Sequence, residues 1–300
     1  MVETGTVRAL LQGSYDLHVH SAPDIMKRKG SDLVMARRAA AAGIQGMLFK
    51  SHNSSTADRV AVVNETAPGC RAYGALTLCH AVGGLNAAAV DVAARLGARL
   101  VWFPTMDAAN EVAYQDAHPN GKKAYWFVAQ QELRQQRVSR PPISIIDGDG
   151  ALVPAVHEIL EVIAAHDMVL ATGHLGVTEI VRLVAAAKAA RVQRIIVSHP
   201  EYPSVAMPIV LQVELARQGM LMERCYRTPY SGKIGWEEQL AAIRAVGPSA
   251  SIVCSDMGQV DAPWPEEALF DFVQRLLEAG FTTEEVRVMT ADNPRSVIEL

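Results

Sequence analysis

The sequence alternates short, β-rich apolar runs with Ala-rich amphipathic segments along most of its 300 residues. The runs that have the length and composition of buried strands are 15–20, 44–51, 71–79, 99–104, 168–173, 194–199, 220–225 and 251–256. Helical patterns fill most of the intervals, near residues 32–42, 56–66, 85–96, 154–166, 177–190, 206–218 and 236–246. Strands that alternate with helices pair in parallel through right-handed crossovers. The sequence therefore predicts an α/β fold, a (β/α)8 TIM barrel.

One stretch, residues 106–150, breaks the alternation after the fourth predicted strand. It holds few apolar positions, and Asp147-Gly-Asp-Gly150 separates the short runs 143–146 and 151–153, which predicts a hairpin. About 45 residues of this composition would form a poor core of their own, so we expect an insertion rather than a second domain. The chain 1–300 is thus expected to be one barrel domain. Its insertion would cover the mouth, and extra C-terminal helices would follow in 265–295.

Composition and charge limit the partners that this chain can have. The 28 Lys and Arg residues nearly balance 32 Asp and Glu residues, so we expect no nucleic-acid and no membrane partner, but a small-molecule substrate. The four cysteines lack metal-binding spacing, and neither a signal-like segment nor an apolar run of membrane length occurs, which predicts a cytoplasmic protein. The four tryptophans leave open a homo-oligomer interface, a substrate wall or plain core packing.

Polar side chains that can bind metal end four of the predicted strands. His18 and His20 end the first strand, and the alternation of side chains sends both to one face, where they can act as a pair of metal ligands. His174, His199 and Asp256 follow the apolar runs of strands five, six and eight. One such residue alone would more often be a structural histidine or a helix N-cap. All of them end strands at the barrel mouth, where catalytic residues lie in this fold.

This arrangement resembles the metal signature of the amidohydrolase superfamily: HxH on strand 1, His on strands 5 and 6, and Asp on strand 8. The C-terminal segment 290–300, with its Asn-Pro pair, is similar to the helix that often ends those enzymes. The resemblance implies that five side chains bind the metal, and that the last of them also takes a proton from metal-activated water. These five are His18, His20, His174, His199 and Asp256.

The sequence departs from the superfamily at strand 4. Two-metal members carry a carbamylated Lys or a Glu there, whereas residues 100–105 read Leu-Val-Trp-Phe-Pro-Thr, so the chain resembles an atypical member. Lys50 ends strand 2, and it could be a carbamylated bridging ligand, an ammonium that orients a substrate carboxylate, or a lysine that reaches the barrel rim. His52 follows on the same face, and as a ligand it resembles the second-strand histidine of PHP-type phosphoesterases.

Three further residues are candidates for binding the substrate. His80 follows strand 3, Glu223 lies within strand 7, and Arg227 comes shortly after that strand. Glu223 interrupts an apolar run, so it could face the interior as a ligand or an acid, or form a salt bridge with Arg224 or Arg227.

The predicted reaction is metal-dependent hydrolysis of a small molecule at a C–N bond of an amide or cyclic amide, or at an ester or lactone bond. The predicted cofactor is one or two divalent ions, with zinc first and manganese, iron or nickel as alternatives. PHP-like phosphoester hydrolysis and metal-dependent decarboxylation are the alternative reactions. A barrel that holds its metal only for structure, or that only binds a ligand, is the alternative outside enzymes, and an open site at the mouth argues against it.

Overall fold

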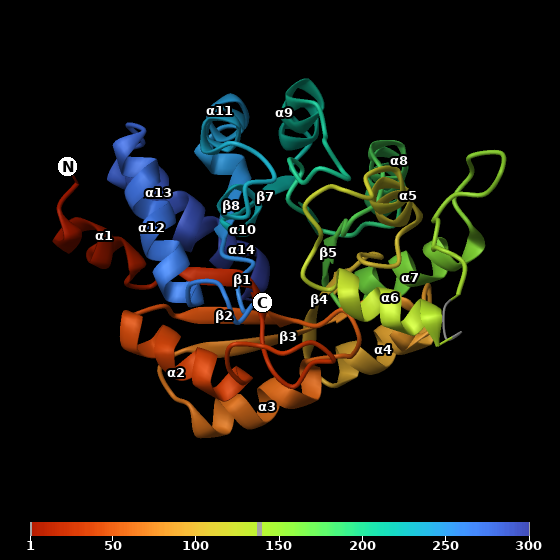
Figure 1. The fold of residues 1–300 in the computed structure, drawn as a ribbon, viewed down its shortest axis with the longest axis horizontal. Helices are drawn as coiled ribbons and strands as arrows, with labels where there is room; N and C mark the ends of the chain where they lie inside the picture. Colours follow the sequence, from red (N-terminus) through yellow and green to blue (C-terminus); the bar gives the residue numbers. More distant parts are fainter. Residues whose placement is uncertain (1, 137–139, 300) are drawn as a thin grey trace.

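Eight parallel strands in chain order form the centre of the protein (Figure 1). The fold comes from a computed structural model, which describes residues 2–136 and 140–299. The strands are β1 Tyr15–His20, β2 Gly46–Lys50, β3 Arg71–Thr77, β4 Ala98–Trp102, β5 Val169–Ala171, β6 Arg194–Val197, β7 Leu221–Cys225 and β8 Ser251–Cys254. Each strand lies inside a run expected from the sequence, except that β4 begins one residue before its run. The prediction of a (β/α)8 barrel is therefore confirmed.

The barrel closes where the segment after β8 returns to β1. The backbone N–H of Asp256 donates to the carbonyl of His18 at 2.9 Å, and the N–H of His20 donates to the carbonyl of Met257 at 2.8 Å. Val19 and Met257 form a parallel bridge there. This closure joins the two ends of the strand order, and it brings the first and last predicted metal ligands side by side.

Helices surround the strands as the alternating pattern predicts. They are α2 Asp32–Ala42, α3 Ala57–Thr66, α4 Ala87–Arg95, α7 Pro154–Ala165, α8 Val177–Ala189, α9 Ile209–Arg217, α11 Trp236–Val246 and α12 Pro265–Glu278. Their buried faces pack on the outer side chains of the strands in two large apolar clusters. The sequence pattern did not predict α1 (Thr4–Leu11), which packs beside α12 (Figure 1). No helix in the described residues combines the length and apolar character that crossing a membrane requires.

The C-terminal segment closes the barrel at the end opposite to the mouth. The helices α13 (Thr283–Arg287) and α14 (Asn293–Ile298) confirm the extra helices expected there, although Leu300 of the family-like motif lies outside the described residues. Val297 and Ile298 belong to the apolar cluster inside the barrel. The hydroxyl of Tyr15 donates to Oε1 of Glu299 at 2.6 Å. This segment therefore fills the interior of the barrel at the end opposite to the mouth.

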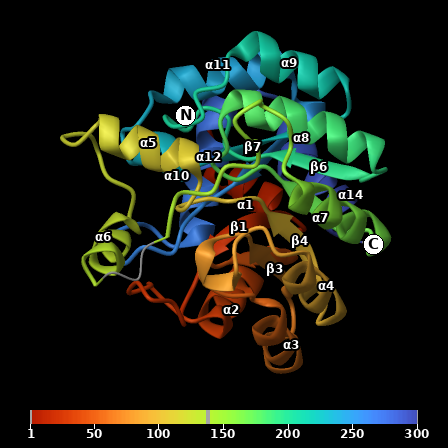
Figure 2. The same ribbon diagram turned by 90° about the vertical axis from the view of Figure 1, so that its right-hand side faces the viewer.

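The insertion 106–150 follows β4 and has structure of its own, with residues 137–139 outside the described part. It contains α5 (Ala109–Ala117) and α6 (Phe127–Gln135), neither of which the sequence pattern indicated. Figure 2 shows α6 at the edge of the molecule, well away from the strands. The expected hairpin is confirmed by an antiparallel bridge between Ile146 and Leu152.

Candidate metal centre

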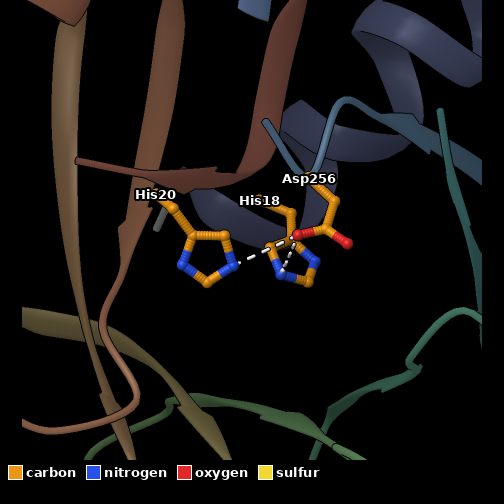
Figure 3. Close-up of side chains that lie close together, drawn as sticks. All are labelled: His18, His20 and Asp256. Atoms are coloured by element: carbon orange, nitrogen blue, oxygen red, sulfur yellow. Dashed lines mark ion pairs between the residues drawn. The ribbon is translucent and has the colours of Figure 1, made fainter. Parts of the chain in front are cut away.

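Two histidines and an aspartate meet where the barrel closes (Figure 3). Nε2 of His18 lies 3.3 Å, and Nε2 of His20 3.1 Å, from the same Oδ1 atom of Asp256. Ligand atoms of the three residues all lie within 4.8 Å of one another, which suits a single divalent ion. Asp256 adopts φ 53°, a left-handed conformation that is uncommon for a residue other than glycine. Its side chain keeps 15% exposure and faces the cavity at the mouth.

Glu223 contacts Nδ1 of His18, on the side of the ring opposite to Nε2 and Asp256. Its Oε1 lies 3.0 Å from Nδ1 of His18, and the carboxylate is buried. A carboxylate on the far nitrogen of an imidazole fixes the ring so that the other nitrogen can bind metal. Glu223 therefore lies on the side of His18 opposite to Asp256, and it is not among the described residues that line the cavity. The alternative pairing with Arg224 is wrong, because strand alternation turns Arg224 to the opposite face, where it pairs with Glu201.

His174 and His199 complete the cluster from β5 and β6. Their ring centroids lie 5.0 Å apart, and the ring of His199 lies 5.9 Å from that of His18. Nδ1 of His199 is buried and has no hydrogen-bond partner among the described residues. A buried imidazole nitrogen without a partner is costly unless it binds something, so this ring suits a metal ligand.

A carboxylate from the insertion stands behind His174. Oε2 of Glu111, on α5, lies 3.2 Å from Nδ1 of His174. Glu111 is fully buried, and it also accepts hydrogen bonds from Ser204 and Gln115. Glu111 thus lies next to Nδ1 of His174 as Glu223 lies next to Nδ1 of His18, although only the contact of Glu223 has the geometry of a hydrogen bond. The sequence analysis did not single out Glu111, and no signal in its neighbourhood distinguished it.

Lys50 lies inside the cluster and not at the barrel rim. Its Nζ is 3.0 Å from Nε2 of His18 and 4.7 Å from the ring centroid of Trp102, and the side chain is buried. Burial lowers the pKa of the Lys50 ammonium. His52 lies next to it, with its ring stacked on that of His20 at 5.0 Å and its Nδ1 2.8 Å from Oγ1 of Thr105. Both residues line the cavity.

His80 does not reach this cavity. The strand β3 ends at Thr77, and the chain then turns into a short helix, His80–Val82, that carries the imidazole outward. Nε2 of His80 lies 2.9 Å from the carbonyl oxygen of Pro141 in the insertion. His80 is therefore not among the described residues that line the metal cavity, whereas Arg227 does line it.

The protonation states favour a bound cation. Burial, together with neighbouring cations and imidazoles, holds the pKa of His20, His52 and His199 well below the usual value. Burial alone would raise the pKa of Asp256, but His18, His20 and Lys50 outweigh it and hold that pKa well below its usual range. Neutral imidazoles beside an ionised carboxylate are the forms that bind divalent metals, so the residues present fit such an ion.

Changing Glu111 to Gln is expected to weaken metal binding by about 10- to 100-fold, because the orienting carboxylate behind His174 is lost. Competition with a chelator of known affinity measures the loss. The matched control is Glu161→Gln on the exposed face of α7, which should leave metal affinity unchanged. Equal affinities in the Glu111 variant and the wild type would show that His174 does not depend on this carboxylate.

Comparisons with known proteins agree with this fold. A model described as "Family of unknown function (DUF6282)" matches residues 13–223. No curated protein matches the chain. Among solved structures, the chain is similar to an amidohydrolase from Pseudomonas aeruginosa, with 11% identity over 99% of this chain and 98% of that one and a TM-score of 0.62. It is also similar to a putative 2-pyrone-4,6-dicarboxylic acid hydrolase from Pseudomonas putida, with 17% identity, 96% and 98% coverage and a TM-score of 0.53.

A third similar structure is a 2,6-dihydroxybenzoate decarboxylase, with 13% identity over 96% of this chain and 100% of that one and a TM-score of 0.52. At such low identities the likeness shows the fold and not the reaction. The resemblance to the amidohydrolase superfamily noted in the sequence is confirmed at the level of that fold.

Proposed function

We propose a reaction for this chain from its own site, because the family to which it belongs, DUF6282, is described only as one of unknown function. The chain is a metal-dependent hydrolase that cleaves the C–N bond of an amide or cyclic amide, or an ester or lactone bond, in a small molecule. The observation that carries the proposal is that His18, His20 and Asp256 lie together at the barrel mouth. The ring centroid of His199 lies 5.9 Å from that of His18.

The described residues offer ligands for one ion or two. His18, His20 and Asp256 would hold one ion, and His174 and His199 would complete its shell or hold a second. Imidazole and carboxylate donors favour zinc and also accept manganese, iron and nickel. When bound, a divalent ion lowers the pKa of water and polarises the bond that is to be broken.

The chain's own groups would move the proton and orient the substrate. Asp256 is the carboxylate that lines the cavity, so it is placed to accept a proton from the attacking water and return it to the leaving group. Glu223 and Glu111 hold His18 and His174 in orientation from behind. Lys50 serves in one of two forms. As an ammonium it orients a substrate anion; as a carbamate, formed when its neutral amine adds CO2 and releases a proton, it binds metal.

Decarboxylation is a second candidate, because the cavity contains cationic side chains that can hold the carboxylate to be cleaved, Lys50 among them. Phosphoester hydrolysis is a third, because His52 lies against His20 and could extend the ligand set.

The two forms of Lys50 differ in the metal content that they need. The carbamate form would require two ions and bicarbonate, whereas the ammonium form fits one ion.

Elemental analysis together with a substrate panel tests the proposal. We expect one or two divalent ions per chain after loading with zinc or manganese, and turnover of lactones or amides that is lost with a chelator. Dependence of the second ion on bicarbonate would identify the carbamate. Release of CO2 from aromatic acids would support the decarboxylase instead, and cleavage of p-nitrophenyl phosphate alone would support the phosphoesterase. A chain that binds neither ion is a barrel without this chemistry.

A further inference from the structure

The cavity in front of the metal centre is strongly cationic. The basic side chains that line it are Arg28, Lys50, Lys123, Arg227 and Lys233. Asp256 is the one carboxylate among the described lining residues. Because like charges that face one cavity repel each other, a neutral ligand would leave this excess of positive charge uncompensated.

Some of these cations already have partners. Nη2 of Arg28 lies 2.6 Å from Oδ2 of Asp24, so its charge is compensated by a buried carboxylate. Nζ of Lys123 donates to the carbonyl oxygens of Gln115 and His118, at 3.3 and 2.8 Å. Lys50 lies against His18 in the metal centre. The charged groups of these three residues therefore already have partners within the protein.

Arg227 and Lys233 differ from Arg28 and Lys123. In residues 2–136 and 140–299 neither side chain has a carboxylate or a carbonyl oxygen as a hydrogen-bond partner, although both line the cavity. Arg227 begins α10 (Arg227–Tyr230), directly after β7, and Lys233 follows that helix. Burial, reinforced by repulsion from Arg227, lowers the pKa of Lys233 to about 8 even though Glu111 and Asp256 act in the opposite direction. Two partly buried cations that have no carboxylate partner and repel each other form a site for an anion.

The surroundings hold Lys233 in place and link it to the metal centre. Its Nζ donates to the hydroxyl of Tyr202, whose ring lies 5.1 Å from that of His174 and 5.0 Å from that of His199, centroid to centroid. Because the Tyr202 hydroxyl accepts this hydrogen bond, it can donate its own proton to an anion. Lys122 of the insertion donates to the carbonyl oxygen of Gly232 at 3.0 Å, so the turn before Lys233 is fixed from outside.

We propose that Arg227 and Lys233 form an oxyanion-binding subsite that holds a carboxylate or phosphate group of the substrate while the bond to be cleaved faces Asp256. This inference rests on the proposed function, because the bound anion is taken to be part of the substrate of the proposed hydrolase. It adds the chemical class of that substrate. The substrates are small anionic amides, lactones or esters. In this arrangement the ring of Tyr202 lies between the anionic group of the substrate and the imidazoles of His174 and His199, which would bind the metal.

Binding of small anions to the zinc-loaded protein tests the subsite without any need for turnover. Calorimetry is carried out with glutarate, its neutral counterpart glutaramide, and inorganic phosphate. We expect glutarate to bind at least about tenfold more tightly than glutaramide, because charge-assisted hydrogen bonds are lost in the diamide. Whichever of glutarate and phosphate binds more tightly identifies the anionic group of the substrate.

Variants assign that binding to the two residues. Arg227→Met and Lys233→Met should each weaken glutarate binding by about tenfold or more, and Lys233→Arg should restore most of it. The matched control is Lys188→Met on the exposed face of α8, with wild-type affinity expected. Zinc content is measured in every variant. Equal binding of glutarate and glutaramide, or wild-type glutarate affinity in both Met variants, would overturn the subsite; a protein that binds glutarate as expected but retains no zinc would overturn the hydrolase and leave the subsite in place.

Discussion

Asp256→Asn is expected to lower kcat of the metal-loaded protein by about three orders of magnitude, while the protein stays folded. The Asn side chain has the same shape, so the packing between β1 and the end of β8 is kept. Its amide can neither take up a proton nor bring a negative charge to His18 and His20, which both lie within 3.3 Å of Oδ1 in the wild type. The measurement is kcat on the best substrate of the panel, with circular dichroism and zinc content taken on the same sample.

The control for this variant is Asp261→Asn, a change of the same kind at an exposed position a few residues further along. It should behave as the wild type in all three measurements. If the Asp256 variant keeps both its zinc and its turnover, Asp256 has no part in the mechanism. If it loses zinc as well as turnover, the role of Asp256 as a ligand is supported, and activity at saturating zinc then shows whether the proton transfer also depends on it.

Gly258→Ala is expected to destabilise the protein by about 3 kcal/mol or more. Gly258 has φ 137°, and a Cβ atom there would overlap the backbone carbonyl oxygen of His20. That oxygen belongs to β1 and cannot move without opening the junction at which β8 returns to β1. We therefore expect the midpoint of urea unfolding to fall sharply, and zinc affinity to fall with it, because the same junction carries the proposed metal ligands His18, His20 and Asp256.

A second glycine separates backbone strain from steric overlap. Gly97 also has a positive φ, 95°, but a Cβ atom added there would meet nothing within 4 Å. Gly97→Ala should thus cost only about 1 kcal/mol, the penalty of the left-handed conformation itself. Equal losses in the two variants would show that the close approach between Gly258 and His20 does not limit stability.

The sequence predicted the barrel well because most strands are compact apolar runs, and four of these runs end at or directly before a histidine or an aspartate. The strand β1 spans the predicted Tyr15–His20, and the rings of His18, His174 and His199 lie close together. These distant residues could be grouped from the chain alone, because the carboxyl ends of all strands in a parallel barrel meet at one mouth. Their roles as ligands stay predictions.

Contacts made by loops could not be predicted in this way. Glu111 lies in a polar helix without strong periodicity, and its place behind His174 depends on how the whole insertion folds back on the barrel. Lys233 is one of many surface-type residues in the sequence, and only the turn after α10 brings it to the cavity. His80 follows a strand as the ligands do, but the short helix that starts there carries it away. Strand periodicity ends where each strand ends, so it says nothing about such turns.

The position of Glu111 has a consequence for anyone who wishes to redesign this barrel. Trimming 106–150 to admit bulkier compounds would do more than widen the entrance, since it would also withdraw the carboxylate behind His174 and the lysine that anchors the turn before Lys233. A remodelled loop would have to bring its own acid to that imidazole and its own anchor to that turn. The proposed metal site and the proposed anion subsite are therefore tied to one segment, and neither can be engineered without attention to the other.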